Sequence, residues 1–171
     1  MTELQLENLS CQYQNFYAVK GVNLHIKGSG VYGILGANGC GKSTLLRAIC
    51  GLQPFTGTCL VNGKSISQLS SKKKGQTIAY LGQNTTANLH LPSIEVVAMG
   101  FYPFLAPFEK PSAKQYQQAQ AALESLGIGQ LAQQDFLTLS GGQQQLVFFA
   151  RTLARPAHLL ILDEADSAVD F

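Results

Sequence analysis

The feature that most constrains this fold is the glycine-rich segment GANGCGKST, residues 36–44, which follows the apolar run VYGIL at 31–35. The segment contains the pattern GxxxxGK[ST], and a helix is predicted from Lys42 to about Cys50, with Gly51 as its C-terminal cap. A short apolar run that breaks into such a loop predicts a strand covered on both faces. The chain is therefore expected to be an α/β protein in which a phosphate-binding loop joins a buried strand to a helix.

The loop contains the residue types that hold phosphate groups. Gly36, Gly39 and Gly41 allow a tight turn whose N–H groups point inward, and the helix N-terminus adds to this anion-binding nest. Lys42 is expected to place its charge against the β- and γ-phosphates of a nucleotide, and Ser43 to offer a hydroxyl ligand to Mg²⁺. The other loop residues expected to line the cofactor site are Ala37, Asn38, Cys40 and Thr44.

A second apolar run, HLLILD at 158–163, predicts a buried parallel strand that ends in two adjacent carboxylates. Asp163 would emerge at the C-terminal edge of the strand, where it can orient Mg²⁺. Glu164 would hold the attacking water and accept its proton. Such a pair is often only a solvated strand end, but its occurrence together with Lys42 favours the catalytic interpretation.

Hydrophobic periodicity predicts the remaining elements. Alternation at 4–9 and 22–26 predicts an N-terminal antiparallel sheet, and 58–62 and 77–81 are predicted strands. The lysine run at 72–74 is predicted to be a solvated loop. Three helices are predicted further along the chain, at 92–100, 112–128 and 140–155. The second has an apolar packing stripe with no evident chemistry: Tyr116, Ala119, Ala122, Leu123 and Leu126.

Composition excludes several classes of protein. The net charge of +2 is far from the strong positive field of a nucleic-acid-binding domain, so no nucleic-acid partner is expected. No apolar stretch reaches the length of a membrane span, and a cytosolic protein is expected. The four cysteines have no metal-ligand spacing and are expected to be free thiols: Cys11, Cys40, Cys50 and Cys59.

The pentapeptide LSGGQ, residues 139–143, lies in the sequence between the glycine-rich loop at 36–44, called the lysine loop below, and the predicted strand at 158–163. Ser140 can cap the helix that follows, while Gly141 and Gly142 leave its first N–H groups bare to meet a phosphate. With these motifs the chain resembles the ATP-binding subunits of ABC transporters. The resemblance implies a P-loop NTPase core with an N-terminal antiparallel β subdomain and a helical insert. The core would comprise about residues 1–84 and 156–171, and the helical subdomain about residues 85–155.

The resemblance also implies a head-to-tail dimer of two copies with ATP and Mg²⁺ buried between them. Residues 140–143, including Gln143, would contact the γ-phosphate held by the other copy's lysine loop. Residues 167–170, SAVD, are similar to the family's SALD, whose aspartate, here Asp170, crosses the dimer interface.

Two further site residues follow from the resemblance. Tyr13 stands where the family stacks an aromatic ring on adenine, although Phe16 and Tyr17 are close by and a tyrosine at a strand end is often only packing. Gln83 corresponds to the glutamine that senses Mg²⁺ and the attacking water, and it would serve both metal binding and catalysis. Gly82 replaces the proline that commonly precedes this glutamine.

The segment VAMGFYPF, residues 97–104, resembles a stretch of importer ATPases for iron-siderophore, haem and cobalamin chelates and their relatives for molybdate or metal ions. The implied function is ATP hydrolysis that powers an integral membrane permease, with the subunit peripheral on the inner face of the membrane. Four residues would then anchor the permease: Phe101, Tyr102, Pro103 and Phe104. The alternative is an aromatic loop packed on its own domain.

The family's switch histidine follows one more strand downstream of SALD, whereas His25, His90 and His158 all precede that point. The chain is therefore expected to be an N-terminal part of the cassette that hydrolyses ATP poorly by itself. Two other functions remain open. One is a soluble ABC ATPase of translation or DNA repair, and the other is a truncated ATP-binding module without hydrolysis.

Overall fold

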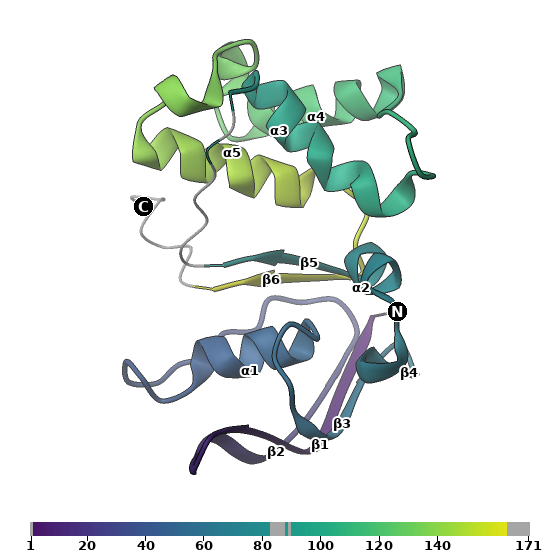
Figure 1. The fold of residues 1–171 in the computed structure, drawn as a ribbon, viewed down its shortest axis with the longest axis vertical. Coiled ribbons are helices and arrows are strands. Elements are labelled where there is room, and N and C mark those ends of the chain that lie inside the picture. Colours follow the sequence, from purple (N-terminus) through teal and green to yellow (C-terminus); the bar gives the residue numbers. More distant parts are fainter. Residues whose placement is uncertain (1, 83–87, 89, 164–171) are drawn as a thin grey trace. The chain divides into compact units, whose positions relative to one another are not determined.

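The computed structural model describes residues 2–82, 88 and 90–163. These residues form two compact units, one that ends at Ile78 and one that begins at Ala79 (Figure 1). Each unit contains both helices and strands, which agrees with the α/β class predicted from the sequence.

The first unit is built on a four-stranded antiparallel sheet in the order β2-β1-β3-β4. Its strands are β1 (Glu3–Tyr13), β2 (Phe16–Lys27), β3 (Thr56–Val61) and β4 (Lys64–Ser65). In the central strand, Leu4 lies opposite Ile26 on one side and Val61 on the other. Leu4 and Leu6 are buried as their alternation predicts, so the predicted antiparallel sheet is confirmed.

The cysteines of the described residues are free thiols, as predicted. Cys11, Cys50 and Cys59 are buried, whereas Cys40 is exposed. Burial raises the pKa of Cys59 to about 11, so this thiol stays protonated near neutral pH. Cys59 therefore acts as a small apolar core residue.

The helix after the lysine loop, α1 (Lys42–Ile49), begins and ends close to the predicted positions. Gly51 has a left-handed φ of 65°, and its N–H donates to the Ala48 carbonyl over 2.9 Å, the geometry of a glycine just past a helix end. The Lys74 ammonium donates to the Gly51 carbonyl over 3.2 Å and thus places a positive charge at the C-terminal end of α1.

The predicted loop at the lysine run is wrong, because residues 72–74 lie in helix α2 (Ser71–Thr77). Ser70 caps this helix, since its hydroxyl accepts a hydrogen bond from the Lys73 N–H. A single turn η1 (Ile66–Gln68) precedes it. The lysine run therefore lies in a short helix with a capped N-terminus. The capping residue Ser70 is a local signal that the sequence-based prediction missed.

The predicted buried strand at residues 31–35 is also wrong. These residues have no regular secondary structure, and Val31 and Leu35 are 103% and 95% exposed. A buried parallel strand requires hydrogen-bonded neighbours. Within the described ranges the sheets comprise only β1–β4 and the pair β5-β6, so this apolar segment pairs with no described strand.

The second unit combines a two-stranded sheet with helices. Strands β5 (Ile78–Leu81) and β6 (Leu159–Leu162) lie side by side and run in the same direction in Figure 1. The predicted strand at 158–163 is confirmed, but its complete burial is wrong: Leu160 and Leu162 are 41% and 38% exposed, and Ile161 is buried. The helical elements are α3 (Ser93–Ala98), η2 (Met99–Phe104), α4 (Ala113–Ser125), η3 (Gly129–Leu131), η4 (Phe136–Thr138) and α5 (Gly141–Leu153).

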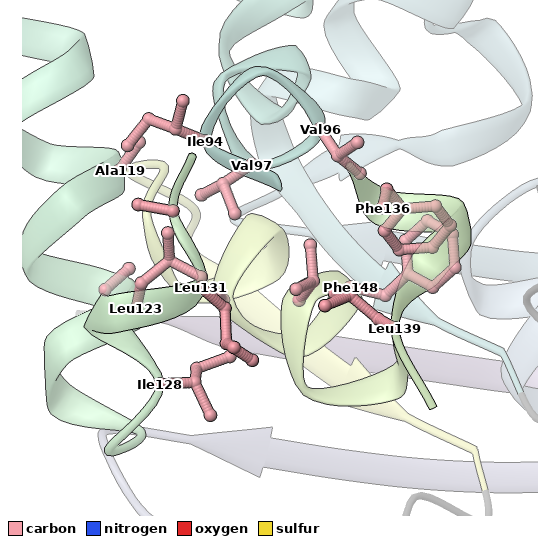
Figure 2. Close-up of a cluster of buried hydrophobic side chains, with 14 of the residues drawn as sticks. Ile94, Val96, Val97, Ala119, Leu123, Ile128, Leu131, Phe136, Leu139 and Phe148 are labelled. Carbon is pink, nitrogen blue, oxygen red and sulfur yellow. The ribbon is translucent and has the colours of Figure 1, made fainter. Parts of the chain in front are cut away.

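The helices α3, α4 and α5 pack against one another around one apolar core. Figure 2 shows this core, in which Phe136 lies beside Phe148. Their ring centroids are 5.0 Å apart at 62°, the edge-to-face geometry that aromatic pairs prefer. From the predicted stripe of α4, Ala119, Ala122 and Leu123 are buried in the same core.

The aromatic segment at 101–104 divides between core and surface. Phe101 is 2% exposed and packs in the helical core, so its predicted role as an anchor for the permease is wrong. Tyr102 is 55% exposed and can meet a partner. Among the described helices, none combines the length and the apolar character that crossing a bilayer requires.

Candidate nucleotide-binding site

The side chain of Lys42 is hydrogen-bonded to the backbone of the lysine loop. The Lys42 ammonium donates hydrogen bonds to the carbonyl oxygens of Gly36, over 2.8 Å, and of Ala37, over 2.9 Å. An ammonium has three N–H donors, so a group held in this way can also bind an oxygen of a ligand. The predicted loop thus exists as a compact turn at the N-terminus of α1, a helix long enough to have an N-terminal dipole.

Gly41 shows why this position of the loop requires glycine. Its φ is +100°, in the left-handed region, and a Cβ there would lie 2.3 Å from the Ala18 carbonyl oxygen and 3.2 Å from Val19. The glycine therefore allows the start of α1 to approach strand β2 closely. The conformation of the loop and its attachment to the sheet depend on the same residue.

In Gly41→Ala the left-handed φ alone is expected to reduce stability by about 1–2 kcal/mol. The total loss should be larger, because the added Cβ would also collide with the Ala18 carbonyl oxygen. Gly63→Ala is the matched control: φ is +72°, but a Cβ meets nothing within 4 Å. Urea unfolding of both variants measures the difference. Equal losses of stability would contradict the importance of the close approach.

Three aromatic side chains lie at the hairpin end beside the loop. Tyr13 and Phe16 stack with centroids 5.9 Å apart and planes at 23°, and both are exposed. The Tyr17 ring lies 5.5 Å from the Lys20 ammonium. Since Tyr17 is adjacent to Ala18, which Gly41 contacts, this hairpin end is next to the lysine loop. The position suits a flat aromatic ligand, and Tyr13, Phe16 and Tyr17 all remain candidates to hold it.

The LSGGQ segment forms the predicted helix cap. The Ser140 hydroxyl accepts from the Gln143 N–H over 3.3 Å, and the Gln143 side chain accepts from the Ser140 N–H over 3.0 Å, a reciprocal capping box. Gly141 and Gly142 are exposed, and a Cβ on either meets nothing within 4 Å. The packing of the described residues therefore does not require glycine at these positions, which leave backbone accessible for a ligand or partner.

Sequence reasoning missed the residue that holds this segment in place. The Gln144 amide donates to the carbonyl oxygens of Phe136 and Leu139, over 3.2 and 3.3 Å, and so ties the start of α5 to the preceding turn. A glutamine directly after LSGGQ gives no signal of its own in sequence, because its partners are backbone atoms that precede the helix.

Asp163 is fixed at the end of β6. Its side chain is buried, with only 4% of the residue exposed, and its N–H donates to the Leu81 carbonyl over 2.9 Å. The Tyr80 hydroxyl donates to Asp163 Oδ2 over 3.0 Å. A buried carboxylate needs such partners, and Tyr80 was not predicted from the sequence.

Three predicted site residues lie outside the described residues: Glu164, Gln83 and Asp170. The loop residues and the LSGGQ residues are grouped as the motifs predict, each within its own unit. Their assigned roles in binding and catalysis stay predictions.

Comparisons with known proteins place these motifs in a family. The sequence model of the family described as "ABC transporter" matches residues 19–167. An uncharacterised ABC transporter ATP-binding protein of Haemophilus influenzae is 39% identical over 98% of this chain and 64% of its own length. The hemin import ATP-binding protein HmuV of Bordetella avium is 38% identical over 98% of this chain and 66% of its own length. The chain thus spans slightly less than two thirds of these relatives.

Solved structures agree with this likeness. One, described as the dimeric post-hydrolysis state of an ATP-binding cassette bound to ADP and phosphate, is 28% identical with a TM-score of 0.85. It covers 98% of this chain, which in turn covers 76% of it. The sequence match and the structural match extend over nearly the whole chain and include both the lysine loop and LSGGQ. The chain belongs to the ABC transporter family, in its ATP-binding part, and has the P-loop NTPase fold of that family with an antiparallel β subdomain.

Proposed function

We propose that this chain binds ATP with Mg²⁺ and forms the nucleotide-binding part of an ABC importer. The observation that carries the proposal is the lysine loop, in which Lys42 is held by two loop carbonyls at the N-terminus of α1. Charge, backbone N–H groups and helix dipole act together there, which is the combination that favours a polyphosphate. The exposed aromatic residues of the adjacent hairpin would stack on the adenine, with Tyr13 as the proposed contact.

The described residues fit Mg²⁺ by their chemistry. The hydroxyl of Ser43 and the buried carboxylate of Asp163 are oxygen ligands of the kind that Mg²⁺ prefers. When bound, Mg²⁺ would neutralise charge on the phosphates. Lys42 would hold the β- and γ-phosphates, and Asp163 would orient the metal site from the end of β6.

Hydrolysis is proposed to depend on residues that follow the two strands β5 and β6. Glu164 would accept the proton of the attacking water, and Gln83 would orient that water and Mg²⁺. These assignments rest on the position of Glu164 directly after Asp163 and of Gln83 two residues after the end of strand β5. These roles are proposed for the ATP-hydrolysing protein in the dimeric form described in the next paragraph.

We infer that two copies join head to tail around ATP. The exposed start of α5 supports this, because Ser140 caps it and, among the described residues, a Cβ on Gly141 or Gly142 would meet nothing within 4 Å. The dimeric cassette among the similar structures has the same fold. Ser140 through Gln143 would contact the phosphates bound by the other copy, and Asp170 would approach the interface.

The proposed partner on the membrane side is an integral permease that imports a metal chelate, a metal ion or an oxyanion. Tyr102 is the exposed aromatic residue of the segment 101–104 and would meet the permease, whereas Phe101 is buried in the helical core. The relative named for hemin import agrees with this substrate class. The chain would then work on the cytoplasmic face of the membrane, and its small net charge gives no support for nucleic acid as a partner.

A pair of equivalent helix caps tests the dimer. Helices α4 and α5 both begin with a capping box, Ser112 with Gln115 and Ser140 with Gln143. Ser112→Ala and Ser140→Ala are each expected to reduce stability by about 1 kcal/mol through the lost cap. Only Ser140→Ala should weaken the association of two copies in the presence of ATP, because only this serine is proposed to contact nucleotide.

The measurement is the ATP dependence of the monomer–dimer equilibrium by analytical ultracentrifugation, with urea unfolding alongside. If both variants dimerise as the parent protein does, or if both lose dimerisation equally, the proposed role of Ser140 at the interface is wrong.

A further inference from the structure

A tyrosine in β5 holds the carboxylate at the end of β6. The Tyr80 hydroxyl donates to Asp163 Oδ2 over 3.0 Å, and the Asp163 N–H donates to the carbonyl of Leu81, the next residue in the same strand, over 2.9 Å. Asp163 is thus attached to β5 by both its main chain and its side chain. Because Asp163 is 4% exposed, bulk water does little to orient this carboxylate.

The Tyr80 ring has a defined place of its own. A Cβ on Gly82 would lie 3.2 Å from the ring edge and from the hydroxyl oxygen, so glycine at this position leaves room for the ring. The ring also lines a pocket of about 140 Å³ together with Gly100, Pro103 and Arg151 from η2 and α5. The hydroxyl therefore reaches Asp163 from a ring for which Gly82 leaves room on one side.

We propose that Tyr80 is a positioning residue of the nucleotide site, whose hydroxyl orients the Asp163 carboxylate for Mg²⁺. The inference rests on the proposed function, which assigns Asp163 to the metal. A phenol is a neutral donor, so it fixes one carboxylate oxygen in direction without adding a positive charge that would compete with a cation. Partners of this kind raise metal affinity by holding a ligand in the binding orientation.

Tyr80→Phe removes the hydroxyl and keeps the ring. The matched control is Tyr116→Phe, because the Tyr116 hydroxyl donates to the Glu95 carboxylate over 2.8 Å in the helical part of the same unit. This hydrogen bond is the main cause that raises the pKa of Tyr116. Each variant therefore loses the hydrogen bonding of a phenol to a carboxylate, and only Tyr80→Phe loses it at Asp163.

The experiment titrates Mg²⁺ into the protein with the fluorescent nucleotide mant-ATP and records the half-saturating Mg²⁺ concentration. Tyr80→Phe is expected to raise this concentration about tenfold or more, a typical effect of removing a hydrogen-bond partner from a metal ligand. Its binding of mant-ATP in EDTA should match that of the parent protein. Tyr116→Phe should change neither quantity.

A double-mutant cycle separates positioning from packing. In an Asp163→Ala background, Tyr80→Phe should have no further effect on the Mg²⁺ requirement, because its target is gone. An unchanged Mg²⁺ requirement in Tyr80→Phe would overturn the inference, and so would an equal loss of mant-ATP binding with and without Mg²⁺. Failure of the parent protein to bind mant-ATP would instead overturn the proposed function on which the inference rests.

Discussion

Replacing Lys42 by alanine is expected to weaken ATP binding at least tenfold. Hydrogen bonds to charged groups contribute about 1.5–3 kcal/mol, and each 1.4 kcal/mol is a factor of ten in affinity. The Lys42 ammonium is held in place by hydrogen bonds to two loop carbonyls, over 2.8 and 2.9 Å. The positive charge of Lys42 is therefore held at the place where the β- and γ-phosphates of ATP are proposed to bind. Titration with mant-ATP measures the loss.

Lys64→Ala is the matched control for this substitution. Lys64 is exposed in β4 of the same unit, so its removal changes the net charge equally without altering the loop. Thermal unfolding of both variants shows whether the fold is retained. If Lys42→Ala and Lys64→Ala bind mant-ATP with equal affinity, the lysine loop is not the nucleotide site.

Replacing Phe136 by alanine is expected to destabilise the protein by about 3–5 kcal/mol, the usual effect of truncating a buried phenylalanine. Phe136 is 0% exposed and packs edge-to-face on Phe148 in the helical core (Figure 2). Small domains have total stabilities of only about 5–15 kcal/mol. This substitution should therefore remove a large part of the free energy of unfolding, which urea denaturation followed by circular dichroism measures.

Phe108→Ala serves as the comparison, because the same ring is removed from a residue that is 105% exposed. Its effect should stay within about 0.5 kcal/mol, as for other surface substitutions. A loss of less than about 1 kcal/mol in Phe136→Ala would show that the helical unit does not depend on this core.

Local patterns predicted the elements that depend on local forces. The hairpin β1–β2 follows from alternation of apolar and polar residues, because each strand has one buried face. Helix α5 follows from Ser140 and the glycines that precede an apolar run, and its capping box is present as expected. The lysine loop was recognisable because its backbone conformation requires glycine at defined positions such as Gly41.

Features that depend on distant partners could not be predicted in this way. The apolar residues at 31–35 have the pattern of a buried strand, but this pattern does not predict whether another strand pairs with them. Phe101 looked like a surface anchor, although its burial depends on packing among three helices. Tyr80 and Asp163 are 83 positions apart, and only the pairing of β5 with β6 brings them together.

The most direct test of the account is hydrogen–deuterium exchange of the chain with and without Mg²⁺ and ATP. If backbone N–H groups of the lysine loop bind phosphate, peptides covering residues 36–44 should exchange more slowly with nucleotide present. The protection should disappear in Lys42→Ala and persist in Lys64→Ala. Unchanged exchange across residues 36–44 at ATP concentrations that saturate binding would contradict the central claim that this loop holds the nucleotide.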